Sequence, residues 1–390
     1  MDGDREPVLD GVRGLAVLLV LFHHLVYLSG IDRHFWPDLQ LFRLVYSSWL
    51  GVDLFFVLSG FLITGILYQA KGSPLFFRSF YGRRVLRIFP LYYGFLVFAL
   101  VAFPLWLPTE STRNLLDHQG WYWSYLSNVY VAREGWQEPS HLGHLWSLAI
   151  EEQFYLLWPL AVWALDRKWL IRLAVACFVG ALVLRYARPF GLDGLDAYVL
   201  LPTRMDSLAA GAFLALVIRG ERGAAVLGRW PQVAAAISFT VVAALYASDG
   251  RLSFEEPLVA VIGYTFIAAG FAALIAMAIT ASSGARLRRA LSALPLVFLG
   301  KYSYGLYVVH VPIILFLHDA GLRATQFPRL FGSSLPGVVV FSAVGGLLSL
   351  AVAVAIYHAW EAPFLRLKRY LPYRREAPPR EVAGNLMPAL

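Results

Sequence analysis

One apolar stretch near the N-terminus, LDGVRGLAVLLVLFHH (residues 9–24), contains an arginine and two histidines. Arg13 and His24 are eleven residues apart. In an α-helix this separation is about three turns with a rise of roughly 16 Å, so both side chains lie on one face. An ionisable side chain inside an apolar span is costly and usually faces a bundle interior or a water-filled cavity. The alternative is that Arg13 extends to the membrane interface and that His24 is a hydrogen-bonded core residue.

Two adjacent carboxylates interrupt a second apolar stretch, HLGHLWSLAIEEQFYLLWP. Glu151 and Glu152 point about 100° apart on a helix, so one can face the bundle centre while the other pairs elsewhere. Packing does not explain two carboxylates at the start of an apolar span, although they could stabilise the helix N-terminus through its dipole. We therefore expect a functional role for this pair.

A cluster of arginines follows another apolar span, in the segment FRSFYGRRVLRIFP. We expect this segment to be a cytoplasmic loop, in which Arg84 and Arg87, three residues apart, would share a helix face. Arginine pairs bind phosphate through parallel hydrogen bonds. The alternatives are the ordinary positive charge of cytoplasmic loops and contact with lipid head groups.

The composition is that of a membrane protein. Of the 390 residues, 59% are hydrophobic and 15% are charged, whereas soluble proteins carry about 25% charged residues. The net charge of +8 does not imply nucleic-acid binding, because cytoplasmic loops of membrane proteins collect Lys and Arg. Cys177 is the only cysteine, so an intrachain disulfide is impossible and a cysteine-based metal site is not expected.

Apolar segments predict an all-α, polytopic membrane protein with about ten transmembrane helices in one bundle, residues 1–370. The predicted spans are 8–28, 45–69, 89–107, 145–165, 170–187, 205–218, 233–247, 257–280, 295–317 and 335–360. We expect a retained first span, because no signal-peptide pattern is evident, and a disordered cytoplasmic tail at 371–390. Lys and Arg are roughly twice as frequent in the connections of one side, which predicts that both termini are cytoplasmic.

Ordered segments along residues 8–367 resemble the acyltransferase 3 family of integral-membrane O-acyltransferases, which acylate sugars of bacterial surface polymers and some antibiotics. These segments are LDGVRGLAVLLVLFHH, GVDLFFVLSGFLIT, RRVLRIFPLYY, HLWSLAIEEQFYLLWP, LPTRMDSLAAG, LGKYSYGLYVVH and EAPFL. The resemblance implies location in a bacterial-type inner membrane. It also implies an acyl-CoA co-substrate, acetyl-CoA by default, bound from the cytoplasm, and a sugar or glycan hydroxyl as the acceptor.

The family's motifs match several of the residues already singled out. Its arginine motif falls on Arg84 and Arg87, which with Arg83 would hold the phosphates of coenzyme A. Some members carry a fused extracytoplasmic hydrolase-like domain that this sequence does not show. We therefore expect peptidoglycan acetylation only if a separate protein supplies that domain.

Acyl transfer to a hydroxyl needs a base near the attacking oxygen, and histidine suits that task near neutral pH. We predict that His24 is the general base and that Arg13 orients the donor or balances charge in the same cavity. Glu152, or else Glu151, would orient the histidine, and no metal is needed. The alternative function is a proton-coupled transporter, which would also bury His, Arg and Glu; a membrane-embedded partner without chemistry is a third possibility.

Overall fold

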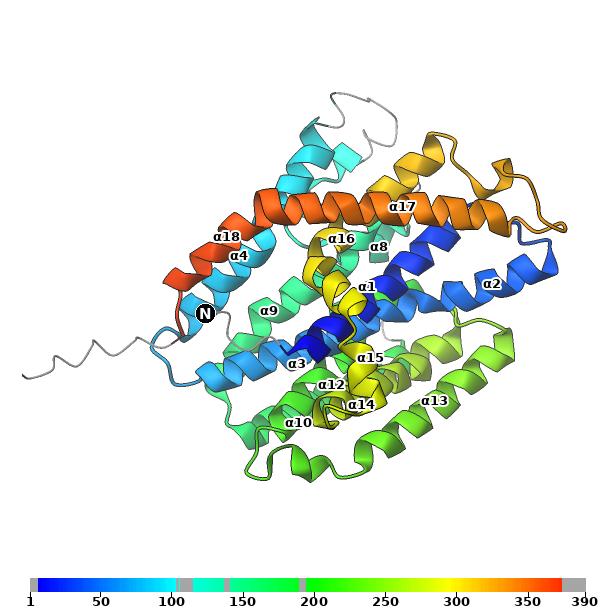
Figure 1. Cartoon of the computed structure of the whole chain (residues 1–390). Coiled ribbons are helices and arrows are strands. Elements are labelled where there is room, and N and C mark those ends of the chain that lie inside the picture. The colour runs from blue at the N-terminus through cyan, green and yellow to red at the C-terminus, as the bar shows by residue number, and fades with distance from the viewer. Residues whose placement is uncertain (1–5, 103–104, 106–114, 137–140, 189–193, 374–390) are drawn as a thin grey trace, which may run out of the picture.

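The computed structural model describes residues 6–102, 105, 115–136, 141–188 and 194–373, and their fold is a bundle of helices (Figure 1). The long helices are α1 (Pro7–Tyr27), α3 (Gly51–Ala70), α4 (Phe76–Val97), α9 (Trp146–Ala164), α10 (Arg167–Ala187), α12 (Leu201–Val217), α13 (Trp230–Asp249), α14 (Tyr264–Thr280), α16 (Leu294–Asp319) and α17 (Leu335–Ile356). Within the described residues, nine segments are long and apolar enough to cross a membrane, and α9, which contains both glutamates, is a further long helix. The predicted all-α membrane fold is therefore confirmed.

Shorter helical elements connect or extend these helices. They include α2 (Trp36–Tyr46), η1 (Ser47–Leu50), η2 (Phe98–Ala102), α7 (Gly120–Trp123), α8 (Ser127–Glu134), η3 (Gly143–Leu145), α11 (Gly194–Val199), η6 (Val259–Gly263), α15 (Arg286–Leu291), η8 (Tyr357–Glu361), α18 (Ala362–Arg366) and η9 (Leu367–Tyr370). The turn η3 leads directly into α9, which places the histidine of that turn at the start of the helix.

The third predicted span is wrong at its beginning. The sequence suggested a start at residue 89, but α4 begins at Phe76, so the arginine cluster lies on a helix and not in a loop. Phe76 and Phe80 are buried between the arginines, and arginine itself is a good helix former. Hydropathy alone missed this part of the helix because the arginines lower its average.

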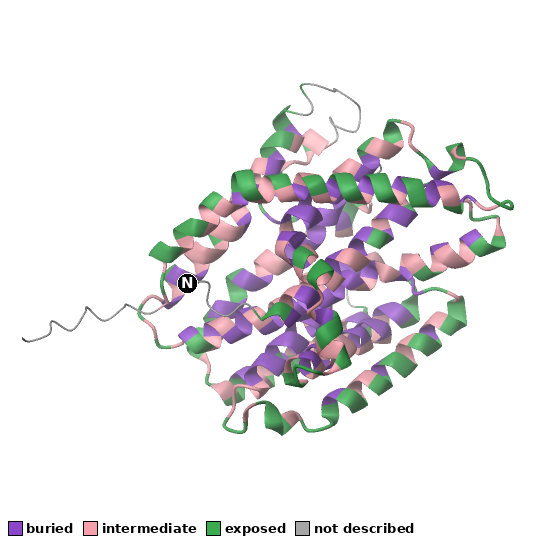
Figure 2. Ribbon diagram, in the orientation of Figure 1, coloured by how far each residue is buried: buried purple, intermediate pink, exposed green. Residues whose placement is uncertain are grey.

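Glycines bring the central helices into close contact. A Cβ atom on Gly14 of α1 or on Gly300 of α16 would lie 1.9 Å from a backbone oxygen of the opposite helix. The same distance applies to Gly60 of α3 and Gly211 of α12. Small residues let membrane helices approach in this way. Figure 2 shows buried residues concentrated on these central helices, whereas α13 and α17 are mainly exposed along the edges of the bundle.

The first residues of the predicted tail are bound to α4. Ser79 Oγ donates a hydrogen bond to the Pro372 carbonyl oxygen at 2.6 Å, and Arg83 Nη1 donates to the Leu371 oxygen at 3.0 Å. Leu371 and Pro372, the first residues of the predicted tail, therefore lie against α4. The predicted tail after Tyr373 lies outside the described residues.

Candidate functional site

Two cavities lie inside the bundle, against opposite ends of α1. The charged cavity has a volume of about 400 Å³, and its ionisable lining residues include Glu6, Asp10, Arg13, Arg84, Arg87, Glu151, Glu152, Lys301 and Lys368. The histidine cavity has a volume of about 280 Å³, and its lining includes His23, His24, Tyr27, Tyr46, Trp49, Trp136, His144, Trp146, Tyr198, Phe254 and Tyr307. Val52 and Tyr307 border both cavities, so these two side chains mark the boundary between them.

Helices α1, α3, α4, α9 and α16, together with η9, supply the polar groups of the charged cavity. Arg13 Nη1 lies 2.6 Å from Asp10 Oδ1, one turn earlier on α1. Ser59 Oγ donates to Glu151 Oε1 and lies 2.9 Å from the Tyr155 hydroxyl. Ser59, next to the closely packed Gly60 on α3, therefore has a polar role in the cavity.

The predicted arginines divide into two groups. Arg84 and Arg87 line the charged cavity, and the Arg84 guanidinium lies 5.5 Å from the Tyr155 ring centroid. Arg83 does not line that cavity, because its Nη1 donates to the carbonyl oxygens of Lys368, at 3.3 Å, and of Leu371, at 3.0 Å. Arg83 thus holds the end of the described chain against α4.

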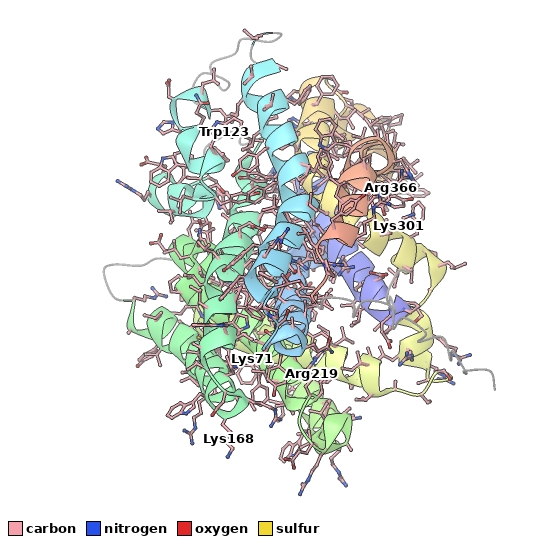
Figure 3. The ribbon with its side chains drawn as sticks, turned by 90° about the vertical axis from the view of Figure 1, so that its left-hand side faces the viewer. Lys71, Trp123, Lys168, Arg219, Lys301 and Arg366 are labelled. Atoms are coloured by element: carbon pink, nitrogen blue, oxygen red, sulfur yellow. The ribbon has the colours of Figure 1, made fainter. Side chains whose placement is uncertain are left out.

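A third cavity, which we call the basic vestibule, lies at the same end of the bundle. Its volume is about 980 Å³, and its basic lining residues are Arg83, Arg84, Arg219 and Lys368. Arg84 and Lys368 line both the vestibule and the charged cavity. The sequence did not single out Arg219 or Lys368, because they follow apolar spans as ordinary loop cations do. Figure 3 shows Arg219 near Lys71 in the view toward this end of the bundle.

Three histidines from three different elements pack against one another beside the histidine cavity, and two of them, His24 and His144, line it. The ring centroids of His24 on α1 and His310 on α16 are 4.9 Å apart, and those of His310 and His144 are 5.3 Å apart. His24 Nδ1 lies 3.0 Å from the Val20 carbonyl oxygen and 3.3 Å from His310 Nε2. His310 and His144 were not predicted as site residues, although each lies in a segment that carries the family resemblance, LGKYSYGLYVVH and HLWSLAIEEQFYLLWP.

The neighbouring His23 has a different environment. Its Nδ1 lies 2.8 Å from the Tyr46 carbonyl oxygen, and its ring stacks on Tyr27 with centroids 5.8 Å apart. His23 therefore belongs to the aromatic wall of the histidine cavity, on the side away from His310.

The expectation that Arg13 shares a cavity with His24 is wrong. Arg13 lines the charged cavity and His24 lines the histidine cavity. The physical reason is the rise of roughly 16 Å between them along α1, which leaves room for Val52 and Tyr307 to border both cavities. The predicted contact between Glu152 and His24 is also not found, because both glutamates line the charged cavity. Among the described residues, His310 is the side chain that meets His24 Nδ1.

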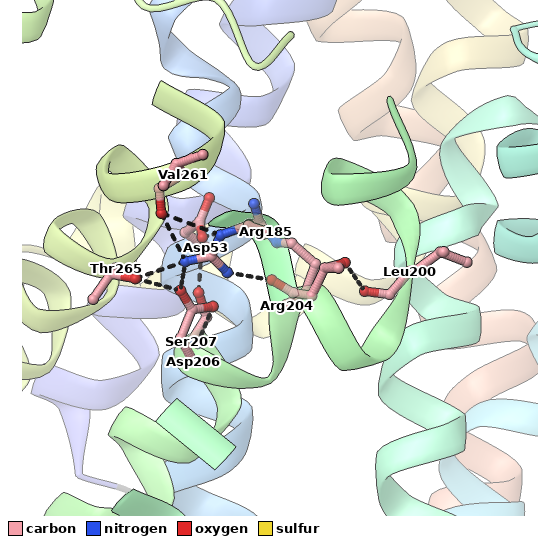
Figure 4. Close-up of polar contacts among 9 residues, drawn as sticks. Asp53, Arg185, Leu200, Arg204, Asp206, Ser207, Val261 and Thr265 are labelled. Carbon is pink, nitrogen blue, oxygen red and sulfur yellow. Dashed lines mark hydrogen bonds and ion pairs between the residues drawn. The ribbon is translucent and has the colours of Figure 1, made fainter. Parts of the chain in front are cut away.

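A buried ionic network holds the helices beside these cavities (Figure 4). Arg204 and Asp206 of α12 are two residues apart, but each pairs with another helix. Arg204 bonds Asp53 of α3, and Asp206 Oδ2 lies 2.7 Å from Arg185 Nη2 of α10. All four side chains are fully buried. The Arg204 guanidinium also lies 5.3 Å from the ring of Tyr198, which lines the histidine cavity. The network thereby ties the wall of that cavity to the helix core.

In the part of the chain that the structure describes, no group of three or more His, Cys, Asp or Glu side chains is arranged to hold a metal ion. The described histidines can carry out acid–base chemistry, and the arginines and lysines can bind anions. A helical membrane bundle with these two cavities is a candidate for group transfer between an anionic donor and a second substrate.

The family comparison agrees with this class. Residues 6–358 match the family model described as an acyltransferase domain. The chain therefore belongs to the acyltransferase 3 family, and the resemblance noted in the sequence is confirmed.

Similar proteins come from several bacteria. The peptidoglycan O-acetyltransferase OatA of Listeria monocytogenes is 30% identical over 350 residues, which are 86% of this chain and 53% of that protein. The putative peptidoglycan O-acetyltransferase YrhL of Bacillus subtilis is 33% identical over 331 residues, covering 79% of this chain and 48% of YrhL. The O-acetyltransferase OatA of Staphylococcus aureus is 30% identical over 347 residues, covering 80% and 51%. The chain thus spans about half the length of these relatives. No solved structure matches the chain.

Proposed function

We propose that the protein transfers an acetyl group from acetyl-CoA to a hydroxyl of a bacterial cell-wall glycan, with peptidoglycan as the first candidate acceptor. One observation carries the proposal: a charged cavity and a histidine cavity border the same residues, Val52 and Tyr307. An anionic donor suits the first cavity and a hydroxyl acceptor suits the second. The names of the relatives support acetyl as the acyl group and peptidoglycan as the acceptor.

Coenzyme A would enter through the basic vestibule. Arg84 and Lys368 line both the vestibule and the charged cavity. They could therefore bind the phosphates of coenzyme A where the vestibule meets the charged cavity. Arg87 lines the charged cavity and Arg219 the vestibule. Arginine contacts with phosphate are charge-assisted and often bidentate. The acetyl thioester would then extend through the charged cavity toward Tyr307.

The acceptor would occupy the histidine cavity. Its walls include Trp49, Trp136 and Trp146, and the flat faces of indole rings suit the apolar faces of sugars. Trp136 belongs to the connection that the loop charges predict to be outside the cell. A glycan arriving from that side would meet His24 before it met the donor.

His24 is the general base in this mechanism. Its Nε2 accepts the proton of the acceptor hydroxyl as the oxygen attacks the acetyl carbonyl carbon. The tetrahedral intermediate collapses, the carbon–sulfur bond breaks, and the thiolate of coenzyme A leaves with the bonding electrons. The proton held on His24 then passes to that thiolate, so the enzyme returns to its starting state and the products are the acetyl ester and free coenzyme A.

The topology that this mechanism needs has both termini in the cytoplasm. Segments rich in Lys and Arg lie together at one end of the bundle, where Lys71 Nζ donates to the Leu165 oxygen and Arg167 Nε donates to the Leu216 oxygen at 2.9 Å. Figure 3 shows Lys71 and Lys168 in the view toward that end. The positive-inside rule favours the cytoplasm for it.

The test is acetyl transfer by the purified protein in detergent. Acetyl-CoA is supplied with peptidoglycan strands or a chitin tetrasaccharide. The release of free thiol is measured, and the mass of the glycan is determined by mass spectrometry. We expect thiol release that depends on the glycan, together with an added acetyl mass. A transporter should produce neither. Because the sequence predicts peptidoglycan acetylation only with a separate extracytoplasmic protein, release of thiol without acetylated glycan would reject direct transfer to this acceptor, and no release with any acceptor would reject the enzyme.

A further inference from the structure

The arrangement of three neighbouring groups determines which nitrogen of His24 carries hydrogen. His310 Nδ1 lies 2.7 Å from the Tyr307 carbonyl oxygen and 3.2 Å from the Leu306 oxygen. A carbonyl oxygen only accepts hydrogen bonds, so His310 Nδ1 must be the protonated nitrogen. In a neutral imidazole the other nitrogen then carries a lone pair.

His310 is neutral because a charged imidazolium at this position would be buried without compensation. The side chain is 1% exposed, and the residues that contact it are helix carbonyls and the rings of His24, His144 and Tyr307. Burying a charge without an opposite charge is strongly unfavourable. The lone pair of His310 Nε2 therefore faces His24 Nδ1 at 3.3 Å.

His24 Nδ1 faces two acceptors, and among the described residues it has no donor opposite it. These acceptors are His310 Nε2 and the Val20 carbonyl oxygen, at 3.3 Å and 3.0 Å. A lone pair on Nδ1 would be repelled by both, so hydrogen must be on Nδ1. The lone pair of neutral His24 is consequently on Nε2, which is the nitrogen that can accept a proton.

We propose that His310 is a positioning residue that holds His24 in the Nδ1–H tautomer and fixes its ring, so that Nε2 is presented as the base. This inference rests on the proposed function of His24. His310 does not line the histidine cavity, so it acts through His24 and not on the substrate. It supplies an acceptor in the place where the sequence had predicted a glutamate, and it does so without adding a negative charge.

His144 completes the packing of His310 but has a different hydrogen-bonding role. Its Nε2 lies 3.1 Å from the Val308 carbonyl oxygen, so that nitrogen carries the hydrogen. Its Nδ1 has no hydrogen-bond partner among the described residues. Both His144 and the backbone of α16 thus hold the His310 ring in place, with its Nε2 against His24 Nδ1, which also lies beside the Val20 carbonyl oxygen.

Substitutions at His310 separate this role from simple packing. His310→Leu keeps an apolar side chain of similar size but removes the acceptor. Loss of a partner that orients a functional histidine typically costs about 10- to 100-fold in activity, so we expect a fall of that size in kcat with little change in KM for acetyl-CoA. In His310→Gln the amide oxygen can accept from His24 Nδ1 while the amide nitrogen donates to the Tyr307 oxygen, and we expect most of kcat to return. His318→Leu, at the exposed end of α16, is the matched control and should behave as the wild type.

The tautomer itself can be measured without substrate. In protein labelled with ¹⁵N-histidine and reconstituted in lipid, the His24 resonances are assigned by their loss in His24→Gln. Hydrogen on Nδ1 is expected in the wild type. Hydrogen on Nε2, or a His310→Leu variant with wild-type kcat, would overturn the inference. If the wild type transfers no acetyl group at all, the proposed function fails, while the tautomer measured in the wild type and in His310→Leu still decides the role of His310. Hydrogen that stays fully on Nδ1 in His310→Leu would assign the tautomer to the Val20 carbonyl oxygen alone.

Discussion

The two cavities of this bundle are lined by different kinds of polar side chain, although helix α1 lines both. At the N-terminal end of α1, Arg13 and Asp10 form an ion pair in a cavity that also holds two glutamates and several cations. At the other end, His24 lies among histidines and aromatic rings. Anion binding benefits from fixed cations, whereas a general base must be unprotonated and must present a lone pair. Because Arg13 and His24 lie near opposite ends of α1, one protein can provide both fixed cations and an unprotonated base.

The largest effect should come from His24. His24→Ala should lower acetyl transfer by about 10²–10⁴-fold, the usual cost of removing a general base, while expression and detergent behaviour stay normal. His23→Ala should keep a substantial fraction of activity, because His23 bonds a backbone carbonyl and stacks on Tyr27. Glycan-dependent thiol release measures both. Near-normal turnover in His24→Ala would show that the histidine cavity does not supply the general base.

The next largest effect concerns the buried network that borders the histidine cavity. Asp53→Asn leaves Arg204 buried without its charge partner, which typically costs about 3–5 kcal/mol of stability. Asp249→Asn is the matched control, because Asp249 pairs with Arg251 in a half-exposed position and such pairs contribute about 0–1 kcal/mol. Thermal unfolding in detergent compares the two variants. Equal melting temperatures would mean that the network does not hold the fold.

Replacing both partners of the buried pair tests the reason for that loss. A double variant, Asp53→Leu with Arg204→Met, removes both charges together, and apolar replacements of buried pairs are often neutral or stabilising. We expect it to melt closer to the wild type than Asp53→Asn does. A double variant as unstable as the single one would point to lost packing instead of an unpaired charge.

A smaller effect is expected from the arginines of the charged cavity. Arg84→Ala and Arg87→Ala should each weaken coenzyme A binding by about ten- to hundred-fold, since a charge-assisted hydrogen bond contributes about 1.5–3 kcal/mol. KM for acetyl-CoA should rise more than kcat falls. Arg78→Ala is the control, because Arg78 is absent from the lining of all three cavities described here. Unchanged coenzyme A binding in the Arg84 and Arg87 double variant would favour the lipid-contact alternative.

The sequence predicted the long helices well because each is a long apolar run, and it predicted the family from ordered motifs. It failed where the outcome depends on packing between helices. Helical spacing predicts that Arg13 and His24 point to the same side of α1. It does not predict that they line two different cavities, both of which Val52 and Tyr307 border. Nor could it bring His310 to His24, because these residues are 286 positions apart and meet only through the close contact of α1 and α16.

The last prediction concerns the side of the membrane that each cavity faces. It uses cysteine substitutions that should leave activity unchanged. In a Cys177→Ser background, single cysteines replace Lys168, beside the vestibule end, and Asp319, at the end of α16 beyond His310. Both positions are exposed.

A membrane-impermeant maleimide applied to intact cells should label the cysteine at 319 and not the cysteine at 168, and permeabilised cells should label both. This result would put the histidine cavity toward the outside, where a glycan arrives, and the arginines toward the cytoplasm, where acetyl-CoA is made. Labelling of position 168 from outside would show that the bundle has the opposite orientation in the membrane. The donor could then not reach Arg84 and Arg87 from the cytoplasm, and the assignment of one cavity to each substrate would fail even if His24 proved essential.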